Sequence, residues 1–157
     1  MPATARPLGG YAALVSAYTT LAGAGALVVG RRSRQGKPVP AVRAGDIVLL
    51  GIGSFKLSRL LAKDKVTSFI RAPFVEPAGT TTAAEMAERP AGDGARKAIG
   101  ELLTCPFCLD QWVATAALLS YLTAPRFTRA AAAGLAMVSV ADVGQYAYRA
   151  VQRTDEQ

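Results

Sequence analysis

Residues 11–30, YAALVSAYTTLAGAGALVVG, are a run of 20 amino acids without a charge, and this run decides the class of fold. At about 1.5 Å of rise per residue, a helix of this length covers about 30 Å, the thickness of the hydrocarbon core of a bilayer. Two further uncharged runs, residues 111–125 and 130–141, follow in the second half of the chain. The sequence therefore predicts a membrane protein with several transmembrane helices.

The composition of the chain agrees with this prediction. Hydrophobic residues make up 51% of the 157 residues, and they gather in long runs although 18% of the residues are charged. The length suits one domain, and no repeat period is visible. We expect residues 1–157 to form a single membrane domain. Its expected fold class is all-α, a small polytopic membrane helical bundle with three or four transmembrane helices and one amphipathic interfacial or short helix.

The net charge of +7 raises the question of nucleic-acid binding. The basic residues gather beside the apolar runs, however, and the first run is directly followed by Arg31, Arg32, Arg34, Lys37 and Arg43. Lysine and arginine next to a span orient it and contact anionic lipid head groups. The sequence has no basic groove interleaved with aromatic residues, so we expect membrane lipids as partners and no nucleic acid.

The first apolar run has some features of a cleaved signal peptide. Arg6 would be the charged start, and Ala-Gly-Ala at residues 22–24 would be the cleavage site. The apolar stretch continues through Val29, however, and then meets RRSR at residues 31–34, which is typical of a stop-transfer signal. We therefore expect residues 11–30 to be retained as span 1.

Residues 46–74 combine an apolar first half with a basic second half. Lys56, Arg59 and Lys63 fall on one face of a helix, with leucines toward the other face. Such a helix either crosses the membrane as a short span 2, with its cations snorkelling to one interface, or lies flat on that interface. The residues expected to contact lipid head groups are Lys63, Lys65 and Arg71.

A connector and a helix start follow this segment. Residues 75–95 are rich in glycine, proline, threonine and acidic residues, which is typical of a mobile loop. Residues 96–103 form a short amphipathic segment. Pro106 disfavours a helical conformation at Cys105 but suits the first position of a new helix. The sequence therefore predicts that Cys105 caps the helix of span 3.

The last two spans are separated by a proline. Span 3 is expected at residues 105–124, because Pro125 ends it. Residues 126–129 are expected to form a tight turn, and span 4 is expected at residues 130–148.

Cys105 and Cys108 are the only cysteines of a chain that has no histidine. Their C-x-x-C spacing and their place at a helix start favour thiol redox chemistry, although the usual βαβ context of such motifs is missing. As a metal site the pair lacks ligands, so a zinc or iron cofactor would require that cysteines be shared between subunits. In a third interpretation, both cysteines and Trp112 simply pack against a neighbouring helix.

Asp142 lies within the last apolar stretch, where an ionisable group is costly and indicates a functional site with a cationic partner. Lys56 and Arg59 are the natural partners. Alternatively, Asp142 lies near the interface and is solvated. From the expected depth of each residue in the membrane, a polar cluster would contain Lys56, Arg59, Asp110 and Asp142, close to the cysteines.

The segment GIGSFKLSRLLAKDKVTSFIRAPF at residues 51–74, followed by ELLTCPFCLDQWVA at residues 101–114, resembles a bacterial membrane-protein family known as domain of unknown function 1360. The matching elements are residues 55–60, 64–65 and 70–74 and the pattern of Cys105, Phe107, Cys108 and Trp112. The resemblance covers roughly residues 47–145, and Lys56 stands where the family has arginine. It implies a multi-pass protein of the bacterial plasma membrane, and it implies no activity.

The distribution of lysine and arginine gives two layouts. If residues 46–74 do not cross, residues 31–101 share the cytoplasmic side and the N-terminus lies outside. If residues 46–62 cross fully, one basic cluster, either residues 31–43 or residues 63–71, must face out, and the family resemblance favours a crossing. The layout with four helices, the second short or tilted, is slightly preferred. Where residues 63–71 stay inside, span 3 starts at the cytoplasmic face and its thiols are reduced.

These observations favour a non-enzymatic scaffold or partner-binding membrane protein, without identifying a reaction. Its expected partners are membrane lipids and a second copy of the chain or another membrane protein. The alternative function is a membrane thiol-redox or metal-binding protein that uses Cys105-Pro-Phe-Cys108.

Overall fold

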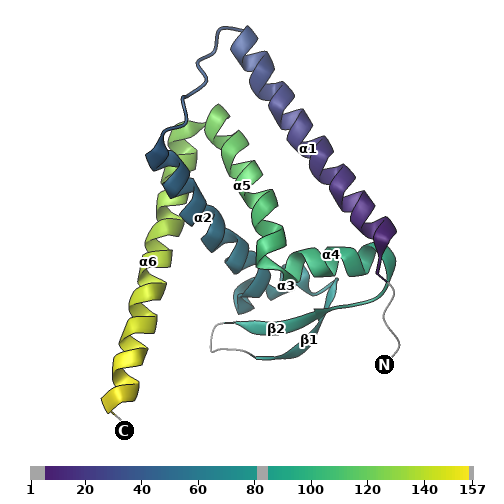
Figure 1. Ribbon diagram of the computed structural model, residues 1–157, viewed down its shortest axis with the longest axis vertical. Coiled ribbons are helices and arrows are strands. Elements are labelled where there is room, and N and C mark those ends of the chain that lie inside the picture. Colours follow the sequence, from purple (N-terminus) through teal and green to yellow (C-terminus); the bar gives the residue numbers. More distant parts are fainter. Residues whose placement is uncertain (1–5, 81–84, 156–157) are drawn as a thin grey trace.

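The computed structural model describes residues 6–80 and 85–155, and most of them are helical, as predicted (Figure 1). The helices are α1 (Leu8–Arg34), α2 (Ala44–Lys63), α3 (Ser68–Arg71), α4 (Gly94–Thr104), α5 (Pro106–Thr123) and α6 (Pro125–Asp155). A 3₁₀ turn, η1 (Lys65–Thr67), joins α2 to α3, and two strands, β1 (Val75–Thr80) and β2 (Met86–Pro90), precede α4.

The centre of the molecule is the packing of α2 against α5 and α6. Leu50 of α2, Tyr121 of α5 and Ala132 of α6 are buried together there. The close approach of α2 and α6 depends on Gly53, because a Cβ atom at this position would lie only 3.1 Å from the Cα and Cβ of Ala132. Small residues allow helices to approach closely where no hydrophobic effect drives them together, as in lipid.

Helix α1 lies apart from this centre and slants along one side of the molecule (Figure 1). Its N-terminal end packs against α4, where a Cβ at Gly10 would lie 2.7 Å from the Cβ of Ala98. Further along, the Tyr18 hydroxyl lies 2.8 Å from the Thr115 hydroxyl of α5. Helix α1 is therefore held beside α4 at its N-terminal end and against α5 as far as Arg32, whose guanidinium donates to the Thr123 carbonyl at 3.3 Å, while most of its residues stay exposed.

Three of the predicted helical segments correspond closely to helices. Residues 11–30 lie within α1, span 3 corresponds to α5, and the amphipathic segment 96–103 lies within α4. By length and composition, α1 and α6 can each cross a membrane, and the pair α4 and α5, bent by 82°, can count as a third crossing. The expected segment 46–74 is divided into α2, η1 and α3.

The prediction of a tight turn at residues 126–129 is wrong. Pro125 does begin a new segment, but it is the first residue of α6, which continues to Asp155 rather than ending at residue 148. Proline is well suited to a first helical position because its missing N–H group would have no helical partner there. The Thr128 amide already donates to the Ala124 carbonyl at 3.1 Å, so the helix closes immediately.

The segment predicted as a mobile loop, residues 75–95, contains an antiparallel hairpin, with residues 81–84 outside the described residues. The prediction of an all-α fold is therefore corrected by a small two-stranded sheet. Its register runs from Val75 opposite Pro90 to Thr80 opposite Met86. Proline and glycine are unfavourable within strands, so the sequence does not indicate these two strands. In the fold, packing of β2 on α4 supports the hairpin.

Candidate functional site

A cleft of about 580 Å³ opens between the C-terminal half of α2 and the C-terminal half of α6. The two helices diverge in this region, and the hairpin lies beyond the end of α2 (Figure 1). The residues that line the cleft are Phe55, Lys56, Arg59, Asp64, Glu85, Ser139, Asp142, Val143, Gln145, Tyr146 and Arg149. Charged side chains of both signs and aromatic side chains therefore face one space.

Lys56 and Asp142 form an ion pair in the cleft, with 2.6 Å between Nζ and Oδ2. The lysine side chain is 11% exposed and the aspartate side chain is 45% exposed, so the pair is reached from the cleft through its carboxylate. Lys56 is thus the partner of Asp142 among the two cations that the sequence suggested. The pair connects α2 to α6, which lie far apart in the sequence.

Arg59 has a different partner. Its guanidinium donates to the carboxylate of Glu85, which immediately precedes β2. The backbone of Glu85 forms an isolated antiparallel β-bridge with that of Asp64. Of the expected polar cluster, Lys56, Arg59 and Asp142 line one cleft. Asp110 does not line it: this residue lies on α5, where its Oδ1 atom is buried with no hydrogen-bond partner among the residues that the structure describes.

Asp64, directly after α2, is a half-buried carboxylate of the cleft. Desolvation by burial raises its pKa above the ordinary value, Glu85 and Asp142 add to this increase, and Lys56 and Arg59 oppose it. At the other side of the cleft, Arg149 is exposed on α6. Within residues 6–80 and 85–155, neither side chain forms an ion pair.

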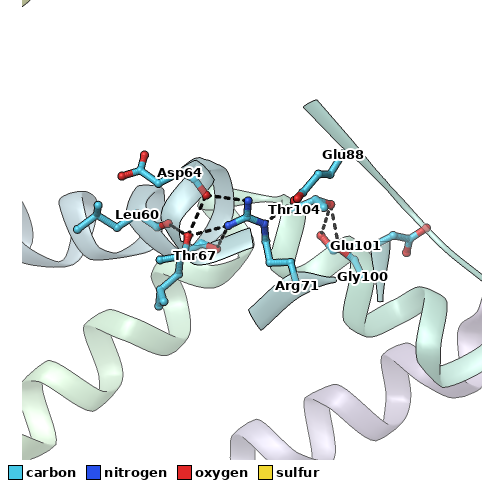
Figure 2. A network of polar contacts seen from close by, with 9 residues as sticks. Leu60, Asp64, Thr67, Arg71, Glu88, Gly100, Glu101 and Thr104 are labelled. Carbon is cyan, nitrogen blue, oxygen red and sulfur yellow. Dashed lines mark hydrogen bonds and ion pairs between the residues drawn. The ribbon is translucent and has the colours of Figure 1, made fainter. Parts of the chain in front are cut away.

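The prediction that Arg71 contacts lipid head groups is wrong, because its side chain is fully buried beneath the hairpin. Its guanidinium donates to the Glu88 carboxylate, to the Leu61 carbonyl at 2.7 Å, to the Thr67 hydroxyl at 2.9 Å and to the Asp64 carbonyl at 3.0 Å (Figure 2). All of these acceptors belong to the protein. Arg71 therefore fixes η1 and β2 to the end of α2.

Lys63 and Lys65, the other two residues expected at lipid head groups, are placed differently from Arg71. Lys63 is half-buried and Lys65 is exposed. Their contact with lipid head groups stays a prediction.

A second polar cluster, which the sequence reasoning missed, lies at the opposite end of α2. The Arg129 Nε atom donates to Asp46 Oδ1 at 2.8 Å, and the hydroxyl of fully buried Tyr121 donates to Asp46 Oδ2 at 2.7 Å. Asp46 also accepts the Arg43 amide at 3.1 Å in a capping box. The cluster ties the start of α2 to the junction of α5 and α6. In the sequence, Asp46 and Arg129 each stand directly before an apolar run, and this position was the signal that could have indicated the cluster.

The two cysteines lie at the sharp bend between α4 and α5, and they do not line the cleft. Cys105 caps α5, as predicted, and its sulfur accepts the Cys108 amide at 3.3 Å. Both thiols are free, their sulfur atoms are 2.7 Å apart, and Cys108 is exposed. Within the described ranges, no group of three or more histidine, cysteine, aspartate or glutamate residues gathers that could hold a metal ion.

Trp112 shows what the cysteine-bearing helix packs against. Its ring meets the ring of Tyr18 edge to face, with 5.3 Å between their centroids. The face of α5 that carries Trp112, a residue expected to pack against a neighbouring helix, is therefore directed toward α1.

Comparison with the curated proteins and with the solved structures gives no match to this chain. A family model described as "Protein of unknown function (DUF1360)" matches residues 49–148. The matched region contains most of α2, the hairpin, α4, α5 and most of α6, and so both the cleft and the cysteines, whereas α1 precedes it. The chain belongs to this DUF1360 family.

Proposed function

We propose that the protein is a multi-pass integral membrane protein of the bacterial plasma membrane in which α1, α2, α5 and α6 all cross the bilayer. The lengths and composition of α1 and α6 support this proposal. The position of α2 supports it as well, because this 20-residue helix packs against both α5 and α6. The start of α2 is fixed to the α5–α6 junction, and its end is fixed to the hairpin through Arg71, which bonds both Glu88 and the Asp64 carbonyl.

In this layout the hairpin end faces the cytoplasm. The cations at that end are Arg6, Lys56, Arg59, Lys63, Lys65, Arg71, Arg89, Arg96, Lys97, Arg149 and Arg153. The opposite end has fewer, namely Arg31, Arg32, Arg34, Lys37, Arg43, Arg126 and Arg129. The side of a membrane protein that carries more lysine and arginine is normally cytoplasmic, so both termini are inside.

The function of this protein is non-enzymatic binding of a membrane partner in the cleft between α2 and α6. The observation that carries the proposal is the cleft itself, whose volume of about 580 Å³ lies within the range of ligand-binding pockets. Its lysine and two of its carboxylates are held in ion pairs. Such fixed charges suit recognition of a charged group, and the aromatic side chains beside them suit an amphipathic one.

Photo-crosslinking from the cleft tests this function. A photoreactive amino acid replaces Ser139, which lines the cleft, and in a control it replaces Met137 on the same helix, which is exposed and does not line it. After irradiation in native membranes, mass spectrometry should show adducts of a single chemical class at position 139. Position 137, which we expect to face bulk lipid, should give a heterogeneous series of lipid adducts. The same heterogeneous series from both positions would contradict specific binding.

A thiol function is the second candidate, and the distance of 2.7 Å between the sulfur atoms of Cys105 and Cys108 favours it. In such a function, the two thiols would reduce an external disulfide to two thiols and become one disulfide themselves. The protons of the first pair then pass to the second, so the exchange is balanced. The exposure of Cys108 at the start of α5 gives a partner access to the pair.

A further inference from the structure

We propose that the cleft between α2 and α6 binds the head group of an aminophospholipid of the phosphatidylethanolamine type. Its ammonium group would lie at Asp64 and its phosphate at Arg149. This inference rests on the proposed binding function and names the class of ligand. Four observations lead to it: the pairing of the charges, the burial of Asp64, the apolar wall of the cleft and the depth of the cleft in the membrane.

The pairing of the charges leaves one group of each sign for a ligand. Three cations and three carboxylates line the cleft, and two ion pairs, Lys56 with Asp142 and Arg59 with Glu85, use four of them. Asp64 and Arg149 remain, and neither forms an ion pair within the described residues. A ligand that carries one positive and one negative group would complement both, and the site would stay neutral overall.

The surroundings of Asp64 favour a cationic ligand group there. The carboxylate is half-buried, and burial together with the negative charges of Glu85 and Asp142 raises its pKa. An ammonium group beside it would offset the lost hydration and the repulsion between the carboxylates. Asp142 is reached from the same space, since its side chain is 45% exposed despite its bond to Lys56. Two carboxylates can therefore accept hydrogen bonds from one primary ammonium.

The apolar wall of the cleft distinguishes a lipid from a free zwitterion. Phe55, Val143 and Tyr146 line the cleft and are all exposed large side chains. Phe55 follows Ile52 on α2, which is also exposed, so an apolar surface continues along the helix from the charged region. Acyl chains can lie on this surface while the head group occupies the charged part, which a small polar ligand would leave uncovered.

The depth of the cleft also fits a head group. Asp142 is the eighteenth residue of α6, so it lies about 26 Å along this helix from its start at Pro125. The charged cluster of Asp46 and Arg129 lies at the first two turns of this helix. A distance of about 26 Å is slightly less than the hydrocarbon thickness of a bilayer, so the cleft begins where acyl chains meet head groups on the hairpin side.

Native mass spectrometry of the delipidated full-length protein in detergent tests the ligand class. The protein is titrated separately with phosphatidylethanolamine, phosphatidylcholine and phosphatidylglycerol that all carry two oleoyl chains. Phosphatidylethanolamine should bind about tenfold more tightly than either of the others. The quaternary ammonium of choline donates no hydrogen bond to Asp64, and the anionic glycerol lipid offers no cation to it.

Two variants and two matched controls locate the binding. Asp64→Asn and Arg149→Gln should each reduce affinity for phosphatidylethanolamine about tenfold, because each removes one charge-assisted contact. Asp93→Asn and Arg153→Gln make the same chemical changes at exposed residues outside the cleft and should leave affinity unchanged. Thermal unfolding of each variant shows that its fold is retained.

Equal affinity for the three lipids, or equal loss of affinity in the cleft variants and the controls, would overturn this inference. A preference for phosphatidylcholine would also overturn it, and would indicate that Phe55 and Tyr146 hold a quaternary ammonium. The binding function itself would survive any of these outcomes if the photoreactive group at position 139 still gave adducts of a single chemical class. If those adducts are absent as well, the proposed function fails together with its ligand.

Discussion

Lys56 of α2 and Asp142 of α6 form an ion pair with 2.6 Å between Nζ and Oδ2, and both residues line the charged cleft. The lysine is almost buried while the aspartate is nearly half exposed, so only the carboxylate is available to a bound molecule. Lys56 thus contributes to the architecture of the site, and Asp142 contributes to its accessible surface.

Replacing Lys56 with methionine should destabilise the packing of α2 on α6. The change leaves Asp142 without its cation, and the expected cost is about 1 to 2 kcal/mol, between the typical values for exposed and buried pairs. The measurement is thermal unfolding in detergent. Arg89→Met breaks the exposed hairpin pair with Glu76 and should change stability by less than about 0.5 kcal/mol. An equal effect of both variants would mean that the Lys56 pair has no special role.

Replacing Arg71 with methionine should release the hairpin from the end of α2. The variant leaves the Glu88 carboxylate buried without a cation and removes one donor from each of two carbonyl groups, so about 3 kcal/mol or more should be lost. Arg71→Lys should recover only a small part, because an ammonium cannot reach acceptors spread around a planar guanidinium. Limited proteolysis within residues 75–95 reports the release. Full protection in Arg71→Met would contradict this assignment.

Asp64→Asn should stabilise the protein at neutral pH. The folded-state pKa of Asp64 is raised, so its ionised form is disfavoured by folding, and this cost is present above the folded-state pKa. The cost decreases as the pH falls through the raised pKa, and it disappears below the ordinary value of 3.8, where the carboxyl is protonated in both the folded and the unfolded state. The difference in melting temperature between wild type and variant should therefore be larger at about pH 7 than at about pH 4. A difference that does not depend on pH would contradict the raised pKa.

Mild oxidation should join Cys105 and Cys108 within one chain. Their sulfur atoms are already adjacent, so diamide should remove both thiols from maleimide labelling without producing a covalent dimer. Intact-mass spectrometry detects the loss of two hydrogen atoms. As a control, Cys108→Ser should leave one labelled thiol under the same conditions. A disulfide-linked dimer of the wild type would instead indicate that cysteines are shared between subunits.

Reporter fusions test the four-crossing layout. A fusion at Lys37, between α1 and α2, should be active outside the cytoplasm, and a fusion at Lys65, after α2, should be active inside, because α2 crosses between them. Fusion at Arg126, in the first turn of α6, should behave like the one at Lys37. Identical behaviour of Lys37 and Lys65 fusions would show that α2 does not cross.

The sequence by itself determined the helical elements. Uncharged runs of 12 to 20 residues predict helices, and proline at position 106 fixes the start of α5 with Cys105 as its cap. These features depend on the composition and order of neighbouring residues, so no knowledge of distant contacts was needed. The resemblance of residues 51–74 and 101–114 to the family is local in the same sense, and the family match over residues 49–148 agrees with it.

Only the tertiary structure decided which charges meet and what they do. Arg71 and Lys65 both look like interfacial cations in the sequence, but Arg71 is buried on carbonyl groups that the turn from α2 into α3 brings together, while Lys65 stays exposed. The hairpin likewise depends on packing against α4 and on Glu88, because its own residues are poor strand formers. The physical reason is that the solvation of a charge depends on atoms brought close by folding, whatever their distance along the chain.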